Sequence, residues 1–239
     1  MGSRRMAVAS AALLACVASC SNNEDTGVLG NGAFRYLCSS ESTDEACTGA
    51  SDVDLPAALA VGASFQIAYS PNSSSSGGVV EGVTGYEIIA ASPEFATTTG
   101  DTIAAQREGL VALLAEHVGK STVDDFIHLR FSTIARLKPS DSQGRPLPLP
   151  VSLGPGESMV VTVEPFDVNA AKLYGQIPCA WYAPGGSPVT VDPNATSRSA
   201  SVQGVGGGTG TVHVTCASAV VDIPFTVSGP PLADGGTNG

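Results

Sequence analysis

The 239-residue chain has few of the side chains that usually carry chemistry. It contains three histidines and one tryptophan, and its 11 basic residues stand against 22 acidic ones. A net charge of −11 repels phosphate backbones, which argues against nucleic acid as a partner. The same charge argues against electrostatic adhesion to anionic lipid, so attachment to a membrane would need a covalent anchor.

The motifs of familiar enzymes and metal sites are also missing. No G-x-S-x-G segment presents a serine nucleophile, and no C-x₂-C spacing occurs. His117, His128 and His213 have no second metal ligand at helical or hairpin spacing. We therefore expect no catalytic residues, no metal and no cofactor in this chain.

Two pairs of acidic residues are candidate cation ligands. Clustered carboxylates can bind calcium between β-domains, but the twelve-residue calcium loop is absent. We interpret Asp124 and Asp125 as a charged turn before a strand, and Asp52 and Asp54 as solvated side chains.

No apolar run reaches the roughly 20 residues that a membrane-spanning helix needs. The longest N-terminal run, Met6 to Val17, has about a dozen residues; Arg4 and Arg5 precede it, and the small residues Ala18 and Ser19 follow it. This order of basic, apolar and small residues is typical of a secretory signal peptide.

The segment Val17-Ala18-Ser19-Cys20 resembles the lipobox of bacterial lipoproteins. The resemblance implies that residues 1–19 are removed and that Cys20 carries acyl chains such as palmitate. Because each buried methylene contributes ~0.8 kcal/mol, more than one chain makes attachment effectively permanent. Cys16 is a rival acceptor, although cleavage before it would leave a very short apolar segment, and an ordinary signal peptide is a further alternative. Ser21 lacks the acidic character of an inner-membrane retention signal, so we expect an outer-membrane lipoprotein.

Four cysteines remain beyond the N-terminal pair, an even number in an exported and oxidising setting. Sequence order suggests two disulfides, Cys38 with Cys47 and Cys179 with Cys216. The chain-entropy model gives about 3 kcal/mol for the shorter loop and about 4 kcal/mol for the longer one. Metal binding is the alternative, and the absence of C-x₂-C spacing and of paired histidines argues against it.

The domain plan follows from composition. The polar residues after the signal predict a flexible tether, and four prolines between Pro139 and Pro150 predict a semi-stiff linker that cannot enter a sheet interior. The last polar residues predict a disordered tail. The predicted order is signal peptide 1–19, tether 20–32, first domain 33–138, linker 139–150, second domain 151–229 and tail 230–239.

The two predicted domains look like copies of each other. Short alternating segments bounded by glycine and proline predict strands throughout. Three pairs of segments align: 62–69 with 156–163 and 129–131 with 223–225 at an offset of 94, and 109–113 with 210–214 at an offset of 101. A repeat near 95 residues has the size of an immunoglobulin domain.

Residues 102–118 are ambiguous. The segment has strong helical propensity and an acceptable i, i+3, i+4 pattern. The repeat instead favours a strand at Leu110–Glu116 after a turn near Gly109. Helix and strand both stay open here, with the strand preferred.

The second half resembles a bacterial immunoglobulin-like domain of the intimin and invasin kind, group 2 (BIG2). The residues that carry the resemblance are a Gly-x-x-φ strand near the start, Trp181, Val202-x-Gly204, Gly-Thr-Val-x-Val at 210–214 and a closing strand at 219–227. About 80 residues are covered, and the first half, which lacks the tryptophan, matches less well. The resemblance implies an all-β chain of two immunoglobulin-like β-sandwich domains in tandem. It places Trp181 in the core beside a disulfide, with a sugar-stacking platform as the alternative.

This family implies a spacer, an adhesive stalk or a display module without catalytic residues. We therefore expect a non-enzymatic lipoprotein of the cell outer membrane, with a protein or a glycan as its candidate ligand. One alternative is a subunit of an envelope assembly in which a sheet edge pairs with a partner strand. Another is a hydrolase with a scattered site, which would require a deep pocket where an acid or base converges on a serine or histidine.

Overall fold

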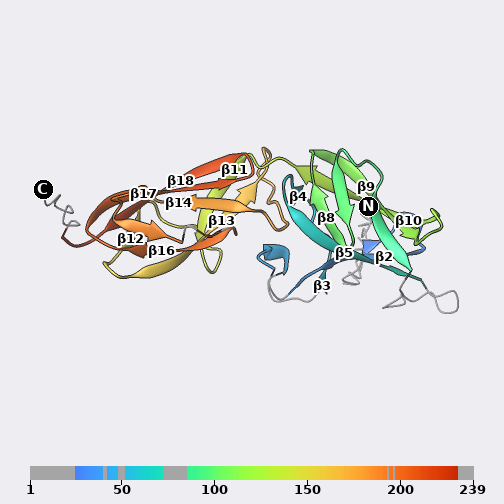
Figure 1. The fold of residues 1–239 in the computed structure, drawn as a ribbon, viewed down its shortest axis with the longest axis horizontal. Coiled ribbons are helices and arrows are strands. Elements are labelled where there is room, and N and C mark those ends of the chain that lie inside the picture. Colours follow the sequence, from blue (N-terminus) through green and yellow to red (C-terminus); the bar gives the residue numbers. More distant parts are fainter. Residues whose placement is uncertain are drawn as a thin grey trace, which may run out of the picture.

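The computed structural model describes residues 25–39, 42–47, 52–72, 85–192, 194–195 and 197–230. Within these residues the chain is all-β, with a single turn of 3-10 helix, η1, at Glu45–Cys47. The strands form four sheets, which pack in pairs into two sandwiches arranged end to end (Figure 1). The predicted signal peptide, Cys16, Cys20 and the tail from residue 231 lie outside the described residues.

In its described residues the first sandwich has ten strands: β1 Asp25–Thr26, β2 Gly32–Leu37, β3 Asp52–Val53, β4 Leu59–Ala60, β5 Ser64–Pro71, β6 Tyr86–Ala90, β7 Ala96–Thr99, β8 Thr102–Ala105, β9 Gly109–His117 and β10 Val123–Ser132. One sheet has the order β1-β2-β5-β8-β7, with β3 also paired to β2. The other sheet has the order β4-β10-β9-β6. The described residues include no helix that is long and apolar enough to cross a membrane.

The part of the second sandwich that the structure describes has eight strands: β11 Arg136–Asp141, β12 Val151–Leu153, β13 Ser158–Phe166, β14 Cys179–Tyr182, β15 Val189–Val191, β16 Ser199–Gly204, β17 Gly208–Cys216 and β18 Ala219–Val227. Its sheets have the orders β11-β13-β16-β15 and β12-β18-β17-β14. The inward-facing residues alternate with outward-facing ones along each long strand, as β17 shows with buried Val212, Val214 and Cys216. Apolar and polar residues therefore alternate along the sequence because one face of each strand is buried in the core.

Both sandwiches have the strand order of an immunoglobulin-like fold. In each, a first strand pairs antiparallel with the next long strand of one sheet, β2 with β5 and β11 with β13. A short strand then crosses to the other sheet and runs parallel to the last strand, β4 beside β10 and β12 beside β18. Four strands ordered like A-B-E-D face a sheet that contains C-F-G, which is the immunoglobulin arrangement.

The predicted repeat has a counterpart in strand register. In the first sandwich Phe131 of β10 lies opposite Gly109 of β9, and in the second Phe225 of β18 lies opposite Gly210 of β17. The two phenylalanines are 94 residues apart in the sequence and the two glycines are 101 apart, as in the sequence alignment. The difference of seven residues therefore lies in the longer β9–β10 hairpin, partly in its loop and partly in its strands, and leaves this pairing of phenylalanine with glycine unchanged.

The ambiguous segment 102–118 is β-structure, which confirms the predicted strand and excludes the helix. β8 and β9 occupy Thr102–Ala105 and Gly109–His117, with Val111, Leu113 and Ala115 buried on one face. β9 is paired with β6 on one side and β10 on the other. Pairing on both edges and burial of a period-two face outweigh an intrinsic helix propensity, which is a weak preference per residue.

The prediction of a flexible tether at 20–32 is wrong for its second half. β1 pairs with β2, and Val28 N–H donates to the carbonyl oxygen of Phe126 at 2.8 Å. The backbone N–H groups of Leu29, Asn31 and Gly32 donate to the carboxylate of Asp125 at 2.8, 2.8 and 3.1 Å. Residues 25–32 therefore belong to the first sandwich.

The interpretation of Asp124 and Asp125 as a charged turn is also wrong. Both lie within β10, and Asp125 is 0% exposed. Its oxygens accept the three N–H groups of the N-terminal segment and the N–H of Phe126, so a buried charge is matched by four donors. Asp124 accepts a hydrogen bond from the hydroxyl of Tyr69 at 2.5 Å. Burial and this hydrogen bond raise the pKa of Tyr69.

The predicted linker at 139–150 begins inside a strand. β11 spans Arg136–Asp141, so Pro139 belongs to the second sandwich, and only residues 133–135 connect β10 to β11. Among the described strands β11 pairs with β13 alone, so it is an edge strand, and an edge tolerates a proline because one side needs no N–H donor. Ile134 in the three-residue connection is buried in the core of the second sandwich.

Replacing Asp125 with Asn should cost about 2 to 3 kcal/mol of unfolding free energy, because one acceptor oxygen becomes a donor that faces backbone N–H groups. Asp101→Asn, in an exposed turn, is the matched control and should change stability by less than about 0.5 kcal/mol. Urea unfolding measures both variants, and amide exchange at residues 29–32 should accelerate only in the first. Equal stability of the two variants would contradict the assignment.

Candidate functional site: the junction between the sandwiches

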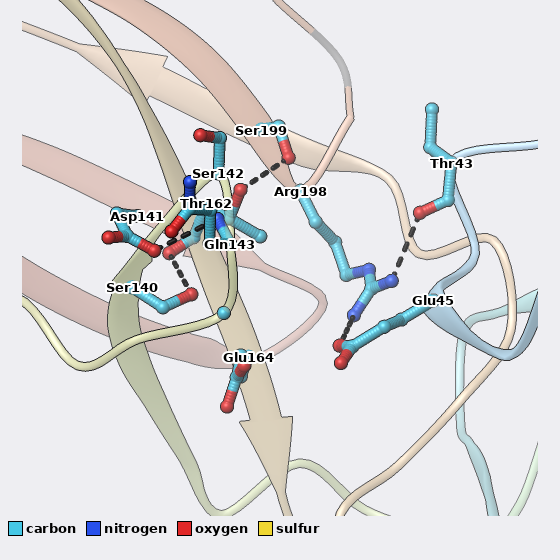
Figure 2. A pocket seen from close by; sticks show the side chains of 11 residues that line it. Thr43, Glu45, Ser140, Asp141, Ser142, Gln143, Thr162, Glu164, Arg198 and Ser199 are labelled. Atoms are coloured by element: carbon cyan, nitrogen blue, oxygen red, sulfur yellow. Dashed lines mark hydrogen bonds and ion pairs between the residues drawn. The ribbon is translucent and has the colours of Figure 1, made fainter. Parts of the chain in front are cut away.

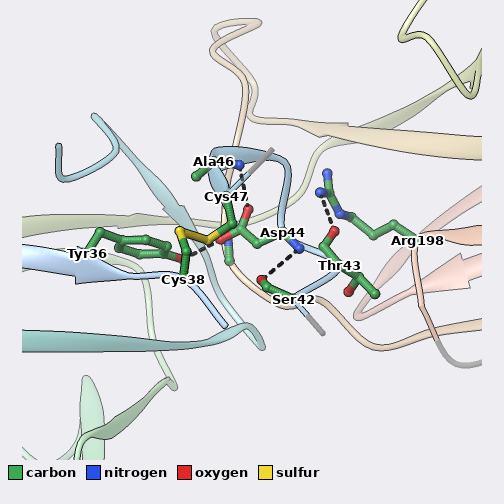
Figure 3. The surroundings of a disulfide bond; sticks show 9 residues. Tyr36, Cys38, Ser42, Thr43, Asp44, Ala46, Cys47 and Arg198 are labelled. Atoms are coloured by element: carbon green, nitrogen blue, oxygen red, sulfur yellow. Dashed lines mark hydrogen bonds between the residues drawn. A yellow bond between two sulfur atoms is a disulfide. The ribbon is translucent and has the colours of Figure 1, made fainter. Parts of the chain in front are cut away.

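The disulfide loop at the end of β2 lies against the second sandwich. Cys38 and Cys47 form one disulfide and Cys179 and Cys216 form the other, so both predicted pairings are present. Figure 3 shows the first disulfide with Asp44 beside it and with Arg198 reaching the loop from the second sandwich. The short loop that the sequence marked only as disulfide-closed is therefore part of the junction between the domains.

Asp44 connects three parts of the structure. It is 3% exposed, and its carboxylate accepts hydrogen bonds from the Tyr36 hydroxyl in β2 and from the Ala46 N–H in the loop. The N–H of Gly175, 131 residues away, donates to the same carboxylate at 2.9 Å. Burial, followed by the charge and hydrogen bond of Asp44, raises the pKa of Tyr36.

Backbone hydrogen bonds continue the contact. Ala60 N–H donates to the Tyr174 carbonyl at 3.0 Å, and Tyr174 N–H donates to the Ala58 carbonyl at 3.2 Å. Ser64 and Gln176 exchange two N–H to carbonyl bonds at 3.0 and 2.8 Å. A loop of the second sandwich thus extends the pairing of the first as a short ladder of bridges.

Apolar packing fills the space beneath this ladder. Leu173 and Ile177 are buried, and Ala58, Ala60 and Ala63 of the first sandwich belong to the core of the second. Domains joined only by a polar contact move relative to each other, whereas a shared apolar core holds them in one arrangement.

Both the backbone conformation at position 175 and the atoms around it require a glycine there. Its φ is +106°, a region that L side chains rarely adopt. A Cβ atom placed on it would lie 2.6 Å from the Cβ of Ala63 in the first sandwich. Close approach of the two domains at this point therefore needs glycine.

Ion pairs surround the ladder. Lys172 Nζ lies 2.5 Å from Glu45 Oε1 and 3.3 Å from Glu164 Oε1. Burial alone would lower the pKa of Lys172, but the hydrogen bond and charge of Glu45, with those of Glu164, outweigh it and raise the pKa. Arg198 Nη2 donates to the Thr43 carbonyl at 3.0 Å, which adds a further link between the domains.

A polar cleft of about 420 Å³ opens beside these contacts. Its walls come from the disulfide loop, from β13 and β16 and from the turn after β11, as Figure 2 shows. The lining residues are Thr43, Glu45, Ser140, Asp141, Ser142, Gln143, Gly144, Thr162, Glu164, Arg198 and Ser199. Among the described residues, none of its serine hydroxyls hydrogen-bonds a histidine or a carboxylate: Ser140 Oγ donates to the Thr162 carbonyl at 3.4 Å, and Ser199 Oγ pairs with Thr162 Oγ1 at 2.8 Å.

The structure places the remaining residues of interest apart from this cleft. Trp181 is 5% exposed, and its Nε1–H donates to the Ser197 carbonyl at 2.8 Å. Cys179 lies opposite Cys216 on β14 and β17, so this disulfide joins neighbouring strands of one sheet. Immunoglobulin domains of antibodies instead bridge the two sheets.

The three histidines lie on different strands and contact different partners. His117 packs against Tyr86, and His213 Nδ1 lies 2.6 Å from Asp222 Oδ1 on the exposed face of its sheet. His128 makes an edge contact with Phe126. Among the described residues, no three His, Cys, Asp or Glu side chains cluster in a way that could hold a metal ion.

Comparison with known proteins gives only remote similarity. No protein-family model matches the chain, and no curated protein matches it. Among solved structures, it is similar to the surface-layer protein SbsC (16% identity, 72% of this chain and 24% of that chain, TM-score 0.32). It is also similar to FdeC, an Escherichia coli adhesin (15% identity, 74% of this chain and 62% of that chain, TM-score 0.34). A third similar structure is that of invasin, a bacterial integrin-binding protein (14% identity, 73% of this chain and 39% of that chain, TM-score 0.33).

The chain spans about a quarter of the length of that surface-layer protein. All three TM-scores are below 0.5, so the fold assignment rests on the strand order described above and not on these matches.

Stability should fall as pH rises through about 10, and Tyr36 should contribute to the fall. Its ordinary pKa of 10.0 is raised in the folded protein, so above pH 10 the unfolded chain releases a proton that the folded one keeps. Tyr36→Phe should therefore be less stable than wild type at pH 7, by about 1 to 3 kcal/mol, but lose less on going to pH 11. Urea unfolding across pH 7 to 11 measures this, and parallel pH curves would count against it.

Gly175→Ala should destabilise the protein more than Gly186→Ala. Both glycines have positive φ, which costs about 1 to 2 kcal/mol for alanine, but a Cβ at Gly186 meets nothing within 4 Å. The clash with Ala63 should add about 1 to 3 kcal/mol to the first variant alone. Denaturant unfolding compares them, and equal losses would show that the junction is not tightly packed at this point.

Proposed function

We propose that this protein is a non-enzymatic surface lipoprotein, anchored through Cys20 in the outer membrane, whose two immunoglobulin-like domains act as a stiff display or adhesion module. The observation that carries the proposal is the junction. Three residues connect the domains, and a buried carboxylate, four backbone hydrogen bonds and a shared core hold them together. A spacer needs fixed geometry between its domains, and these contacts supply it.

The N-terminal segment supports the same role. Asp25, the first described residue, follows Cys20 by only five positions, and from there the chain is paired with β2 and bonded to Asp125. An anchor at Cys20 would thus attach close to the folded domain. Covalent acyl chains would hold it at the membrane despite the net negative charge of the protein.

The arrangement of side chains supports a role without catalysis. The described cleft has no hydroxyl paired with a general base, and the conspicuous Trp181 is a core residue that hydrogen-bonds the backbone. A hydrolase would need an acid or base converging on a nucleophile. The net negative charge argues against nucleic acid as a partner, and the ligand that we propose is a protein or a glycan.

A second candidate function is a subunit of an envelope assembly. β14 ends its sheet, and a groove of about 320 Å³ beside it is lined by Tyr182, Pro184 and Val189 among others. Tyr182 is 60% exposed. An extended partner segment could pair with this edge through its backbone. Native mass after detergent extraction distinguishes the two roles, since the assembly requires a second component.

Cys20→Ala should release the protein from the membrane. Without the acceptor thiol no lipid is attached, so the variant should move from the outer-membrane fraction to the soluble periplasmic fraction. Cys16→Ala is the matched control and should stay in the membrane fraction with a lipidated mass. Cell fractionation with mass spectrometry of the N-terminus measures both. Unchanged membrane attachment of Cys20→Ala would refute the anchor, and loss of attachment in Cys16→Ala alone would move it to Cys16.

A further inference from the structure

Two large apolar side chains are held in solvent at the corner of a tight turn. Gly30 N–H donates to the Gly27 carbonyl at 3.0 Å, so Val28 and Leu29 are the central residues of a β-turn. Their side chains are 57% and 55% exposed. Turn corners are usually occupied by glycine, proline, asparagine, aspartate or serine. A valine and a leucine at this corner add apolar surface that the core does not use.

The turn is fixed against β10 by its backbone. Val28 N–H donates to the Phe126 carbonyl at 2.8 Å, and Leu29 N–H donates to the buried carboxylate of Asp125 at 2.8 Å. The polar groups of the turn are therefore directed toward the sandwich, and the two apolar side chains remain on the outside.

Two exposed valines flank the neighbouring hairpin loop. Val118 follows β9 and Val123 begins β10, and they are 58% and 38% exposed. Val123 precedes Phe126, whose carbonyl accepts the N–H of Val28, by three positions, which is about 10 Å of strand. The turn and the hairpin therefore lie at the same end of the first sandwich. We call Val28, Leu29, Val118 and Val123 the apical patch.

The apical patch lies at the end of the first sandwich away from the second. β10 runs from Val123 for about 30 Å to Ser132, and residues 133–135 then lead into the second sandwich. β2 likewise begins at Gly32, just after the turn, and ends beside the disulfide loop of the junction. Figure 1 shows the β9–β10 hairpin at this outer end of the molecule.

The charges at this end differ from those of the whole chain. Segments 27–32 and 118–123 contain one charged residue, Lys120, in a chain of net charge −11. Asp124, next to Val123, hydrogen-bonds the Tyr69 hydroxyl. Apolar side chains beside a lysine suit a membrane interface, where the ammonium group reaches lipid phosphates and the apolar groups enter the acyl boundary.

The distance to the proposed anchor selects lipid as the occupant of the patch. Asp25 follows Cys20 by five residues, which span at most about 17 Å, and it precedes Val28 by three, which span at most about 10 Å. A protein held by acyl chains at Cys20 therefore keeps the patch within about 30 Å of the bilayer. Tethering makes the contact intramolecular, so even a small patch stays bound. A second copy of the chain fits less well, because stable protein interfaces use about 20 to 30 residues a side.

We propose that the apical patch inserts into the interface of the bilayer that carries the anchor and so holds the two sandwiches upright on the membrane. The inference rests on the anchor proposed above and deepens it. The acyl chains at Cys20 limit the distance from the membrane, and the patch sets the orientation. The rigid junction then places the second sandwich away from the lipid.

The test compares the mature chain, residues 20–239, free in solution and attached to phosphatidylcholine nanodiscs. Attachment couples the thiol of Cys20 to a maleimide lipid, since Cys38, Cys47, Cys179 and Cys216 are in disulfides. A water-soluble gadolinium chelate relaxes exposed methyl groups, and NMR measures the rate for each valine and leucine.

On nanodiscs the relaxation of the patch methyl groups should fall at least about 3-fold, because insertion by about 5 to 10 Å excludes the chelate. Leu110 is the internal control, because it is 69% exposed and lies at the junction end of β9. Its relaxation should not change. A tether without insertion protects neither group, so unchanged relaxation of the patch on nanodiscs would overturn the proposal.

A double variant, Leu29→Asp with Val118→Asp, should lose this protection. Leu110→Asp is the matched control and should keep it. All three positions are exposed, so the substitutions should leave the fold intact, which urea unfolding verifies. Protection that persists in the folded double variant would show that the patch is not what meets the lipid.

Sedimentation of the mature chain without lipid tests the other occupant. The chain should be monomeric at about 100 μM. A dimer that dissociates in the double variant would assign the patch to a second copy and exclude the lipid role. The anchor is tested separately by the mass of the native N-terminus, because coupling through the Cys20 thiol does not depend on native acylation. Failure of the patch and failure of the anchor are therefore distinguishable.

Discussion

The arrangement of the two domains depends on the hydrogen bonds that the buried carboxylate of Asp44 accepts. It is buried where the disulfide loop, β2 and the second sandwich meet, and it accepts a hydrogen bond from each. A buried charge is stable only when its hydrogen bonds are complete, and here one of them comes from the other domain. The first sandwich therefore presents a carboxylate oxygen that accepts the Gly175 N–H of the second sandwich when the two domains are packed together.

The first sandwich uses the same device a second time, at its other contact with a distant segment. Asp125 is fully buried in β10 and holds the N-terminal segment through three backbone N–H groups. In both cases a strand or loop supplies a carboxylate, and a segment without long regular structure supplies the donors. Charge-assisted bonds of this kind are stronger than neutral ones, so they can order short segments that bury little apolar surface.

The sequence predicted the sheets better than the contacts between them. Alternation and the repeat gave the strands, including β9 in place of a helix, because burial of one face has a period of two. Both disulfides were predicted from the order of the four cysteines along the chain. The roles of Asp44 and Arg198 could not be predicted, since their partners are 131 and 155 residues away and no local pattern records them. The prediction of a charged turn at Asp124 and Asp125 was wrong for the same reason. Two adjacent acidic residues indicate an exposed turn unless the distant N–H donors that bind them are known.

In each sandwich, the early strand that crosses between the sheets lies beside the last strand and runs in the same direction, β4 with β10 and β12 with β18. If a ligand bound far from the membrane pulled against an anchored N-terminus, the two neighbouring strands would be dragged past each other along their length. All the hydrogen bonds between them would then bear the load together, instead of breaking one after another as in a peeled hairpin. The strand order would thus place the hydrogen bonds of these parallel pairs in shear under such a load.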